Sequence, residues 1–214
     1  MTGYDPILLD LDGTVIDTVA LIRESHRHAV RTVLGREMTD EQLVAQVGRP
    51  LIEQMQVFSP EHADELFRVY REWNHANTAA LIASYDGIDG VLSALKADGR
   101  TLGIVTSKSR DAVDLAFASI PIEHFFEVVI TADDSTLHKP NAAPVLAGFD
   151  ALGRSSNGGC YVGDAPFDLQ AAAAAGVAGI GVTWGFFPRS VLEAEEPRAI
   201  VETPEELLSA LRGG

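Results

Sequence analysis

Short apolar runs alternate with amphipathic helical patterns over most of the chain. The apolar runs contain few polar residues and lie at residues 6–11, 101–106, 127–131, 159–163 and 178–183. Helical patterns lie at residues 87–98, 109–118, 141–152, 166–175 and 204–211. Strands that alternate with helices predict an α/β fold with a doubly wound parallel sheet, and continuous apolar strands fit a sheet buried on both faces. In such sheets ligands bind beyond the carboxyl ends of the strands.

The interval between Thr14 and Gly87 breaks this alternation. It shows no strand pattern, and its apolar spacing predicts helices at residues 19–34, 39–47, 50–57 and 60–82. The sequence therefore predicts an inserted all-helical domain over residues 17–84, with the α/β core formed by residues 1–16 and 85–214.

Composition and charge exclude several classes of protein. The chain has 214 residues, 46% of them hydrophobic and 22% charged, as in a globular protein with one main core and a smaller module. The net charge of −15 argues against a nucleic-acid partner, because no basic surface is available to displace counterions from phosphates. No apolar stretch reaches the roughly 20 residues of a membrane span, and no secretory signal pattern opens the chain. We therefore expect a cytoplasmic protein with no membrane partner.

Two minor features complete this picture. The single cysteine, Cys160, lies in an apolar run, which predicts a core residue and a reducing compartment without disulfides. His26 and His28 stand among arginines in the first predicted helix of the insertion, which predicts a solvated face.

Two acidic residues follow the first predicted strand, in the run Ile7-Leu8-Leu9-Asp10-Leu11-Asp12-Gly13-Thr14. Asp10 and Asp12 are two positions apart, so their side chains project to the same face of an extended chain. Carboxylates that close repel each other unless a cation lies between them. A divalent metal bound by oxygen ligands would supply that cation, and the sequence therefore predicts a metal site at this edge of the sheet.

Three further groups of polar residues follow other predicted strands. They are Thr106-Ser107-Lys108, Lys139-Pro140 and Gly163-Asp164-Ala165-Pro166-Phe167-Asp168. Because the carboxyl ends of parallel strands meet at one edge, we expect these groups to gather beside the first two acids. Acids for a metal, with hydroxyl and ammonium groups for phosphate oxygens, are typical of a phosphotransfer site.

In this order the four groups resemble the four motifs of the haloacid dehalogenase superfamily, whose signature is D-x-D-G-T after the first strand. The resemblance covers nearly the whole chain and implies a Rossmann-like core with the helical insertion as a C1 cap. It also implies a Mg²⁺-dependent phosphatase. Asp10 would be the nucleophile, and Asp12 would protonate the leaving oxygen and then deprotonate the hydrolytic water. The implied metal ligands are Asp10, Asp12 (through its backbone carbonyl), Asp164 and Asp168, and the implied phosphoryl-binding residues are Thr106 and Lys139.

Within this superfamily the chain is similar to phosphoglycolate phosphatases and to the HAD-type pyrophosphatase, notably over residues 101–108 and 70–75. Thr78 stands where that pyrophosphatase has a second cap histidine. Dehalogenases lack the second aspartate, so Asp12 indicates phosphate esters or anhydrides. The resemblance implies a small anionic phosphate substrate, 2-phosphoglycolate or pyrophosphate. The candidate substrate-binding residues are Gly13, Arg49, His75, Ser107 and Lys108.

Two other functions are compatible with the motifs. A phosphomutase shares this core and cap but keeps the aspartyl-phosphate until a sugar phosphate takes it. A receiver-like phospho-switch, which is not an enzyme, also places acids, a hydroxyl and a lysine at strand ends. It is shorter, however, and lacks the Gly-Thr turn and the helical insertion. A phosphonate hydrolase would need a cap lysine, and no lysine precedes Lys96. The chain alone is compatible with a monomer or a homodimer.

Overall fold

The computed structural model describes residues 3–213 and contains a six-stranded sheet in the order β5-β4-β1-β6-β7-β8. Every pairing in this sheet is parallel. The strands are β1 (Ile7–Leu9), β4 (Leu102–Val105), β5 (Val128–Ile130), β6 (Cys160–Gly163), β7 (Ala178–Val182) and β8 (Ala199–Val201). The predicted parallel sheet is confirmed, with β8 as an additional edge strand that the apolar patterns did not indicate.

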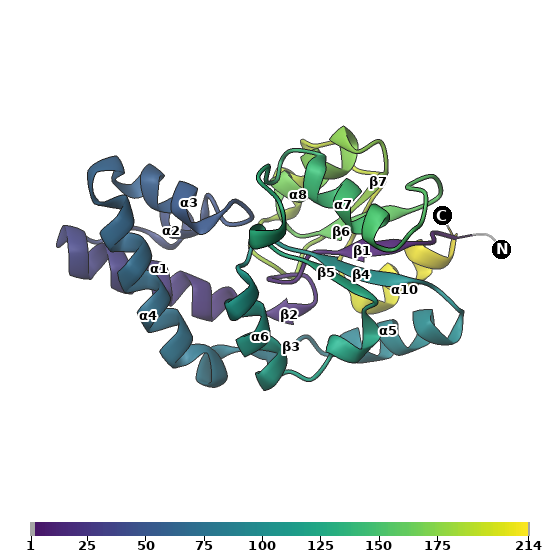
Figure 1. Cartoon of the computed structure of the whole chain (residues 1–214), viewed down its shortest axis with the longest axis horizontal. Helices are drawn as coiled ribbons and strands as arrows, with labels where there is room; N and C mark the ends of the chain where they lie inside the picture. Colours follow the sequence, from purple (N-terminus) through teal and green to yellow (C-terminus); the bar gives the residue numbers. More distant parts are fainter. Residues whose placement is uncertain (1–2, 214) are drawn as a thin grey trace.

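Alternating side chains of the central strands divide the core into two layers. Ile7 and Leu9 face one side, which is covered by α5 (Ile88–Ala97), α6 (Arg110–Ser119) and α10 (Pro204–Gly213). Leu8 faces the other side, where it packs with Val105 and Tyr161 under α7 (Ala143–Ala151) and α8 (Pro166–Ala174). Figure 1 shows the two helix layers on opposite faces of the sheet, as a doubly wound fold requires.

Helices α1 to α4 form a second group, at the end of the molecule away from the two chain termini (Figure 1). They are α1 (Val19–Leu34), α2 (Asp40–Val44), α3 (Leu51–Phe58) and α4 (Ala63–Leu81), with a 3₁₀ turn at Pro60–His62 before α4. Their buried residues form a separate hydrophobic cluster that includes Leu43, Met55 and Leu66. The helical insertion predicted from the sequence is therefore present.

The expectation that the interval 14–87 contains no strand is wrong. β2 (Ile16–Asp17) and β3 (Ala83–Ser84) pair antiparallel where the chain passes between the helical group and the core. Two-residue strands are too short to show an alternating pattern. The domain boundaries expected after residues 16 and 84 fall at this ribbon. Residues 1–2 and 214 of the expected core lie outside the described residues.

His26 does not lie on a solvated face, as its arginine neighbours suggested. It is 0% exposed, and its ring packs against Phe58 and Tyr70 at centroid distances of 5.3 and 4.8 Å. His28 is partly exposed and stacks on Trp73 at 5.7 Å. His26 shares the buried face of α1 with residues one turn away on either side. This apolar spacing, rather than the neighbouring arginines, indicates the side of the helix on which His26 lies.

Other features of the fold agree with the sequence patterns or add to them. Cys160 is fully buried in β6, as predicted. A short helix that the patterns missed, α9 (Arg189–Glu193), lies between β7 and β8. Within residues 3–213, no helix has the length and hydropathy needed to cross a membrane.

Candidate active site

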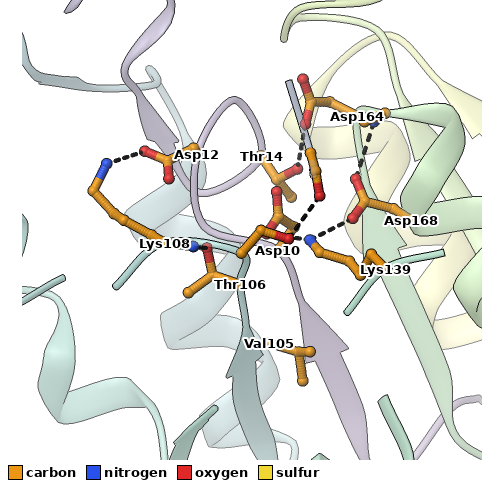
Figure 2. A network of polar contacts seen from close by, with 12 residues as sticks. Asp10, Asp12, Thr14, Val105, Thr106, Lys108, Lys139, Asp164 and Asp168 are labelled. Atoms are coloured by element: carbon orange, nitrogen blue, oxygen red, sulfur yellow. Dashed lines mark hydrogen bonds and ion pairs between the residues drawn. The ribbon is translucent and has the colours of Figure 1, made fainter. Parts of the chain in front are cut away.

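Lys139 joins two buried carboxylates at the carboxyl edge of the sheet (Figure 2). Its Nζ donates hydrogen bonds to Asp10 Oδ1 at 2.8 Å and to Asp168 Oδ1 at 2.7 Å. The three side chains are 1%, 6% and 0% exposed, respectively. Asp168 lies in the first turn of α8, where its Oδ2 accepts a hydrogen bond from the backbone N–H of Ala165 at 3.0 Å. Asp168 therefore caps the helix and binds the lysine at the same time.

Asp164 lies beside this pair and is also buried. Its Oδ1 accepts a hydrogen bond from Thr14 Oγ1 at 3.3 Å, and its Oδ2 accepts one from the Phe186 N–H at 2.6 Å. Carboxylate atoms of Asp10, Asp164 and Asp168 all lie within 4.8 Å of one another. Four chain segments that are distant in sequence thus converge on one cluster of acids.

Gly13 is required by the turn that brings Thr14 to Asp164. Its φ is +79°, a conformation that residues with a Cβ rarely adopt. A Cβ at this position would also overlap the Asp164 carboxylate. The glycine predicted as a site residue therefore acts through the backbone and leaves room for an acid.

Burial and mutual repulsion control the charges in this cluster. Burial raises the pKa of Asp10 to about 7, with Lys139 opposing the rise and Asp168 adding to it. Burial also raises the pKa of Asp164 well above its usual range, and the charges of Asp168 and Asp10 add to this effect. Burial alone would lower the pKa of Lys139, but the carboxylates of Asp10 and Asp168 raise it, so the side chain is an ammonium.

Three buried acids beside one ammonium leave a deficit of positive charge. Oxygen ligands held this close together suit a hard divalent cation, which would make the ionised form of all three acids favourable. The donor set of Asp10, Asp164 and Asp168 therefore fits Mg²⁺.

Asp12 does not belong to this cluster through its carboxylate. Its Oδ1 instead accepts a hydrogen bond from Lys108 Nζ at 2.8 Å, away from the pair formed by Asp10 and Lys139 (Figure 2). The side chains of Asp12 and Lys108 are only 12% and 9% exposed. Thr106, at the end of β4, accepts a hydrogen bond from the Lys108 N–H at 3.2 Å. The two aspartates of the first motif thus pair with two different lysines, where the sequence suggested one bridging cation.

A cavity of about 280 Å³ connects these residues with the helical group. Asp10, Asp12, Thr106, Lys108 and Lys139 line it from the core, and Arg49 and His75 line it from the insertion. The Arg49 guanidinium lies over the Phe167 ring, 4.8 Å from its centroid, and its Nε is buried without a hydrogen-bond partner among the described residues. All these candidate residues therefore face one space.

Ser107 also lines the cavity, but its hydroxyl is already engaged. Ser107 Oγ donates a hydrogen bond of 2.6 Å to the carbonyl of Gly48, in the loop that carries Arg49. The contact joins the core to the insertion, and it adds a structural role to the substrate contact that the resemblance implied.

Sequence reasoning missed Tyr161. This buried residue of β6 accepts a hydrogen bond from Lys139 Nζ at 3.0 Å, and its hydroxyl donates to the Val105 carbonyl at 2.7 Å. With Asp10 and Asp168, Tyr161 gives each of the three ammonium hydrogens of Lys139 an acceptor. The feature of the sequence that indicates a role for Tyr161 is its hydroxyl in an otherwise apolar strand, next to the Gly163-Asp164 motif.

The family model described as haloacid dehalogenase-like hydrolase matches residues 7–182, a span that includes the three buried acids, both lysines and the helical insertion. The chain belongs to the haloacid dehalogenase-like hydrolases. Pyrophosphatase PpaX of Anoxybacillus flavithermus is 35% identical over 209 residues, which cover 98% of this chain and 97% of that protein. Pyrophosphatase PpaX of Bacillus velezensis is 35% identical over 202 residues, which cover 94% of each chain. The superfamily inferred from the four motifs is confirmed.

Solved structures share the fold over nearly the whole length of this haloacid dehalogenase-like chain. A structure described as a predicted phosphatase from Clostridium acetobutylicum has a TM-score of 0.87 at 25% identity and covers 97% of this chain and 98% of its own. A predicted phosphoglycolate phosphatase from Haemophilus somnus has a TM-score of 0.88 at 23% identity, covers 98% of both chains, and supports the fold alone. The family model and the PpaX relatives confirm the predicted enzyme class, a phosphatase of this family.

Proposed function

We propose that this protein is a Mg²⁺-dependent phosphatase that hydrolyses a small phosphorylated metabolite in the cytoplasm through an aspartyl-phosphate intermediate. The observation that carries the proposal is the placement of Asp10. Its carboxylate lines the cavity, is oriented by Lys139 at 2.8 Å, and lies within 4.8 Å of two further buried acids. A carboxylate nucleophile needs fixed orientation and compensation of charge, and this arrangement supplies both.

Asp10, Asp164, Asp168 and the backbone carbonyl of Asp12 would hold the Mg²⁺. Both oxygens of Asp168 already accept hydrogen bonds, from Lys139 and from the Ala165 N–H, which favours contact with the metal through a water molecule. When bound, Mg²⁺ would offset the negative charge of the phosphoryl oxygens and of the Asp10 carboxylate.

In the first step the Asp10 carboxylate attacks phosphorus and the bond to the leaving oxygen breaks. Asp12 gives that oxygen a proton, then takes a proton from the water that hydrolyses the aspartyl-phosphate. Thr106, Lys108 and Lys139 line the cavity. Thr106 and Lys108 would bind the phosphoryl oxygens, and the ammonium charge of Lys139 would stabilise them while its hydrogens stay on Asp10, Asp168 and Tyr161. Positioning and charge stabilisation supply most of the rate in such transfers.

Helices α1 to α4 would act as the cap that selects the substrate. They bring Arg49 and His75 to the cavity that Asp10 lines from the core. A guanidinium can bind a carboxylate or a phosphate with two hydrogen bonds, so Arg49 would bind a second anionic group of the substrate. Together with the names of the PpaX relatives, this favours pyrophosphate or 2-phosphoglycolate as the substrate.

The test is phosphate release with Mg²⁺ from a panel of pyrophosphate, 2-phosphoglycolate, hexose phosphates, nucleoside monophosphates and p-nitrophenyl phosphate. We expect turnover that is abolished by chelation and by Asp10→Asn, a nearly isosteric change that removes the nucleophilic charge. Substantial turnover by the Asp10→Asn variant would refute the mechanism.

The same panel separates the two alternative functions. If no compound is hydrolysed while a small phosphodonor labels the wild type but not the Asp10→Asn variant, the protein is a mutase or a phospho-accepting switch. Transfer of the label to a sugar phosphate would then identify the mutase.

A further inference from the structure

Arg71, a residue that the motifs did not single out, lines the cavity from α4 together with His75, one helical turn further on. Its Nη2 pairs with Asp111 Oδ2 of α6, across the boundary between the helical group and the core. His75 Nε2 lies 3.8 Å from the same carboxylate oxygen. One acid of the core thus pairs with Arg71 and lies near His75, and both of these residues of the insertion line the candidate active site.

We propose that Arg71 is a specificity-determining residue that binds the second anionic group of the substrate, and that Asp111 takes the place of that group while the site is free. This inference rests on the phosphatase function proposed above and names which substrates the site prefers. The chemical class is a phosphate compound whose leaving group carries its own negative charge, such as a second phosphate or a carboxylate.

The ion pair between Arg71 and Asp111 is weak enough for a substrate anion to replace Asp111 as the partner of Arg71. The two side chains are 38% and 47% exposed, and an ion pair so accessible to water shifts an equilibrium by a factor of about five at most. Asp111 keeps other support when the arginine leaves, because Ser109 Oγ donates to its Oδ1 at 2.6 Å and it lies in the first turn of α6. The guanidinium of Arg71 lies over the Phe67 ring at 5.5 Å, which supports it independently of Asp111.

A substrate anion inside the cavity would compete well for Arg71. The Asp111 side chain is 47% exposed, whereas Asp10, Asp12, Lys108 and Lys139, which line the cavity, are at most 12% exposed. Charge-assisted hydrogen bonds are stronger where water is excluded. Arg49 lines the same cavity from the loop before α3 and has a buried Nε without a partner among the described residues. A leaving group with its own charge would therefore meet two guanidinium groups.

A purely structural role for this ion pair predicts a different result. If the contact between Arg71 and Asp111 served only to hold the insertion closed over the core, losing either partner would open it in the same way. Both substitutions would then impair the enzyme alike, for every substrate. Exchange with the substrate instead predicts effects of opposite sign, confined to substrates with a second anionic group.

The experiment compares Arg71→Gln, Asp111→Asn and the double variant in the full-length protein with Mg²⁺. The readout is the ratio of kcat/KM for 2-phosphoglycolate or pyrophosphate to kcat/KM for p-nitrophenyl phosphate, whose leaving group has no second anionic group before cleavage. Because both substrates carry the transferred phosphoryl group, general changes in its binding or in folding cancel in this ratio. Arg68→Gln is the matched control, since Arg68 pairs with Glu72 on α4, 2.9 Å away, and does not line the cavity.

We expect Arg71→Gln to lower the ratio about tenfold, the effect of one charge-assisted hydrogen bond. Asp111→Asn should raise it by a factor of about two to five, since it frees the arginine. That gain should disappear in the double variant, and Arg68→Gln should leave the ratio unchanged.

Equal losses in the two single variants, or a gain from Asp111→Asn that persists without Arg71, would overturn the inference. Hydrolysis of p-nitrophenyl phosphate by the wild type, abolished by Asp10→Asn, keeps this outcome separate from a failure of the proposed function. If no compound of the panel is hydrolysed, the phosphatase proposal itself fails.

Discussion

Replacing Lys139 with methionine removes the ammonium that pairs with Asp10 and Asp168. The lysine side chain is 1% exposed, and its two carboxylate partners are 6% and 0% exposed. Methionine is similar in length but has no charge and no donor, so the buried acids lose their counter-ion with little change in packed volume. The Tyr161 hydroxyl also loses a hydrogen-bond donor.

The size of the effect follows from burial. Removing one partner of a buried ion pair costs about 3–5 kcal/mol of unfolding free energy, since the remaining charge is left without compensation. For a chain of this length 1 kcal/mol shifts the melting temperature by about 2–4 °C, so we expect Tm to fall by roughly 6–20 °C. Activity should also be lost, because Asp10 loses the contact that orients it.

The assay is thermal unfolding followed by circular dichroism in EDTA, so that metal binding does not contribute. Lys96→Met is the control, because Lys96 pairs with Glu127 at the surface, where the two side chains are 35% and 40% exposed. An ion pair of that kind contributes less than about 1 kcal/mol. If Lys139→Met lowered Tm no more than Lys96→Met, the interpretation of Lys139 as the essential counter-ion of the acid cluster would be refuted.

Three further predictions concern other parts of the molecule. Burial lowers the pKa of His26 from 6.5 to about 3. Between these two values the imidazole of the unfolded chain binds a proton and that of the folded chain does not. Stability is therefore lost as the pH falls, by about 2 kcal/mol at pH 5, and urea unfolding of His26→Leu should lack this component of the pH dependence. Tyr161→Phe should lower kcat about tenfold while KM changes little. The control is Tyr85→Phe, which removes a buried hydroxyl without a partner among the described residues and should not alter kcat. Gly13→Ala should lower kcat about 100-fold, because its methyl group displaces Asp164, and unaltered steady-state kinetics would contradict the role assigned to this turn.

The sequence by itself determined the architecture and the groups of polar residues at the strand ends. Apolar runs that alternate with helical patterns specify a parallel sheet, because strands buried on both faces are mainly apolar and leave charged residues to the strand ends. For that reason the acids and lysines stood out beside the motifs of the superfamily, and the structure brings Asp10, Asp164, Asp168 and Lys139 together as expected. The helices of the insertion were also visible, since their apolar spacing follows the helical period.

Only the tertiary structure decided which charge pairs with which. Lys108 binds Asp12 while Lys139 binds Asp10, Asp168 and Tyr161, and pairs separated by 22 to 129 residues leave no local signal. The β2–β3 ribbon and the burial of His26 likewise depend on contacts between segments rather than on local pattern. The pairing of Asp111 with Arg71, near His75, has the same origin, because the packing of α4 against α6 brings the three side chains together. The amino-acid sequence specifies which charged and polar side chains are present. Packing in the tertiary structure sets the distances between them, and those distances determine which side chains form the site.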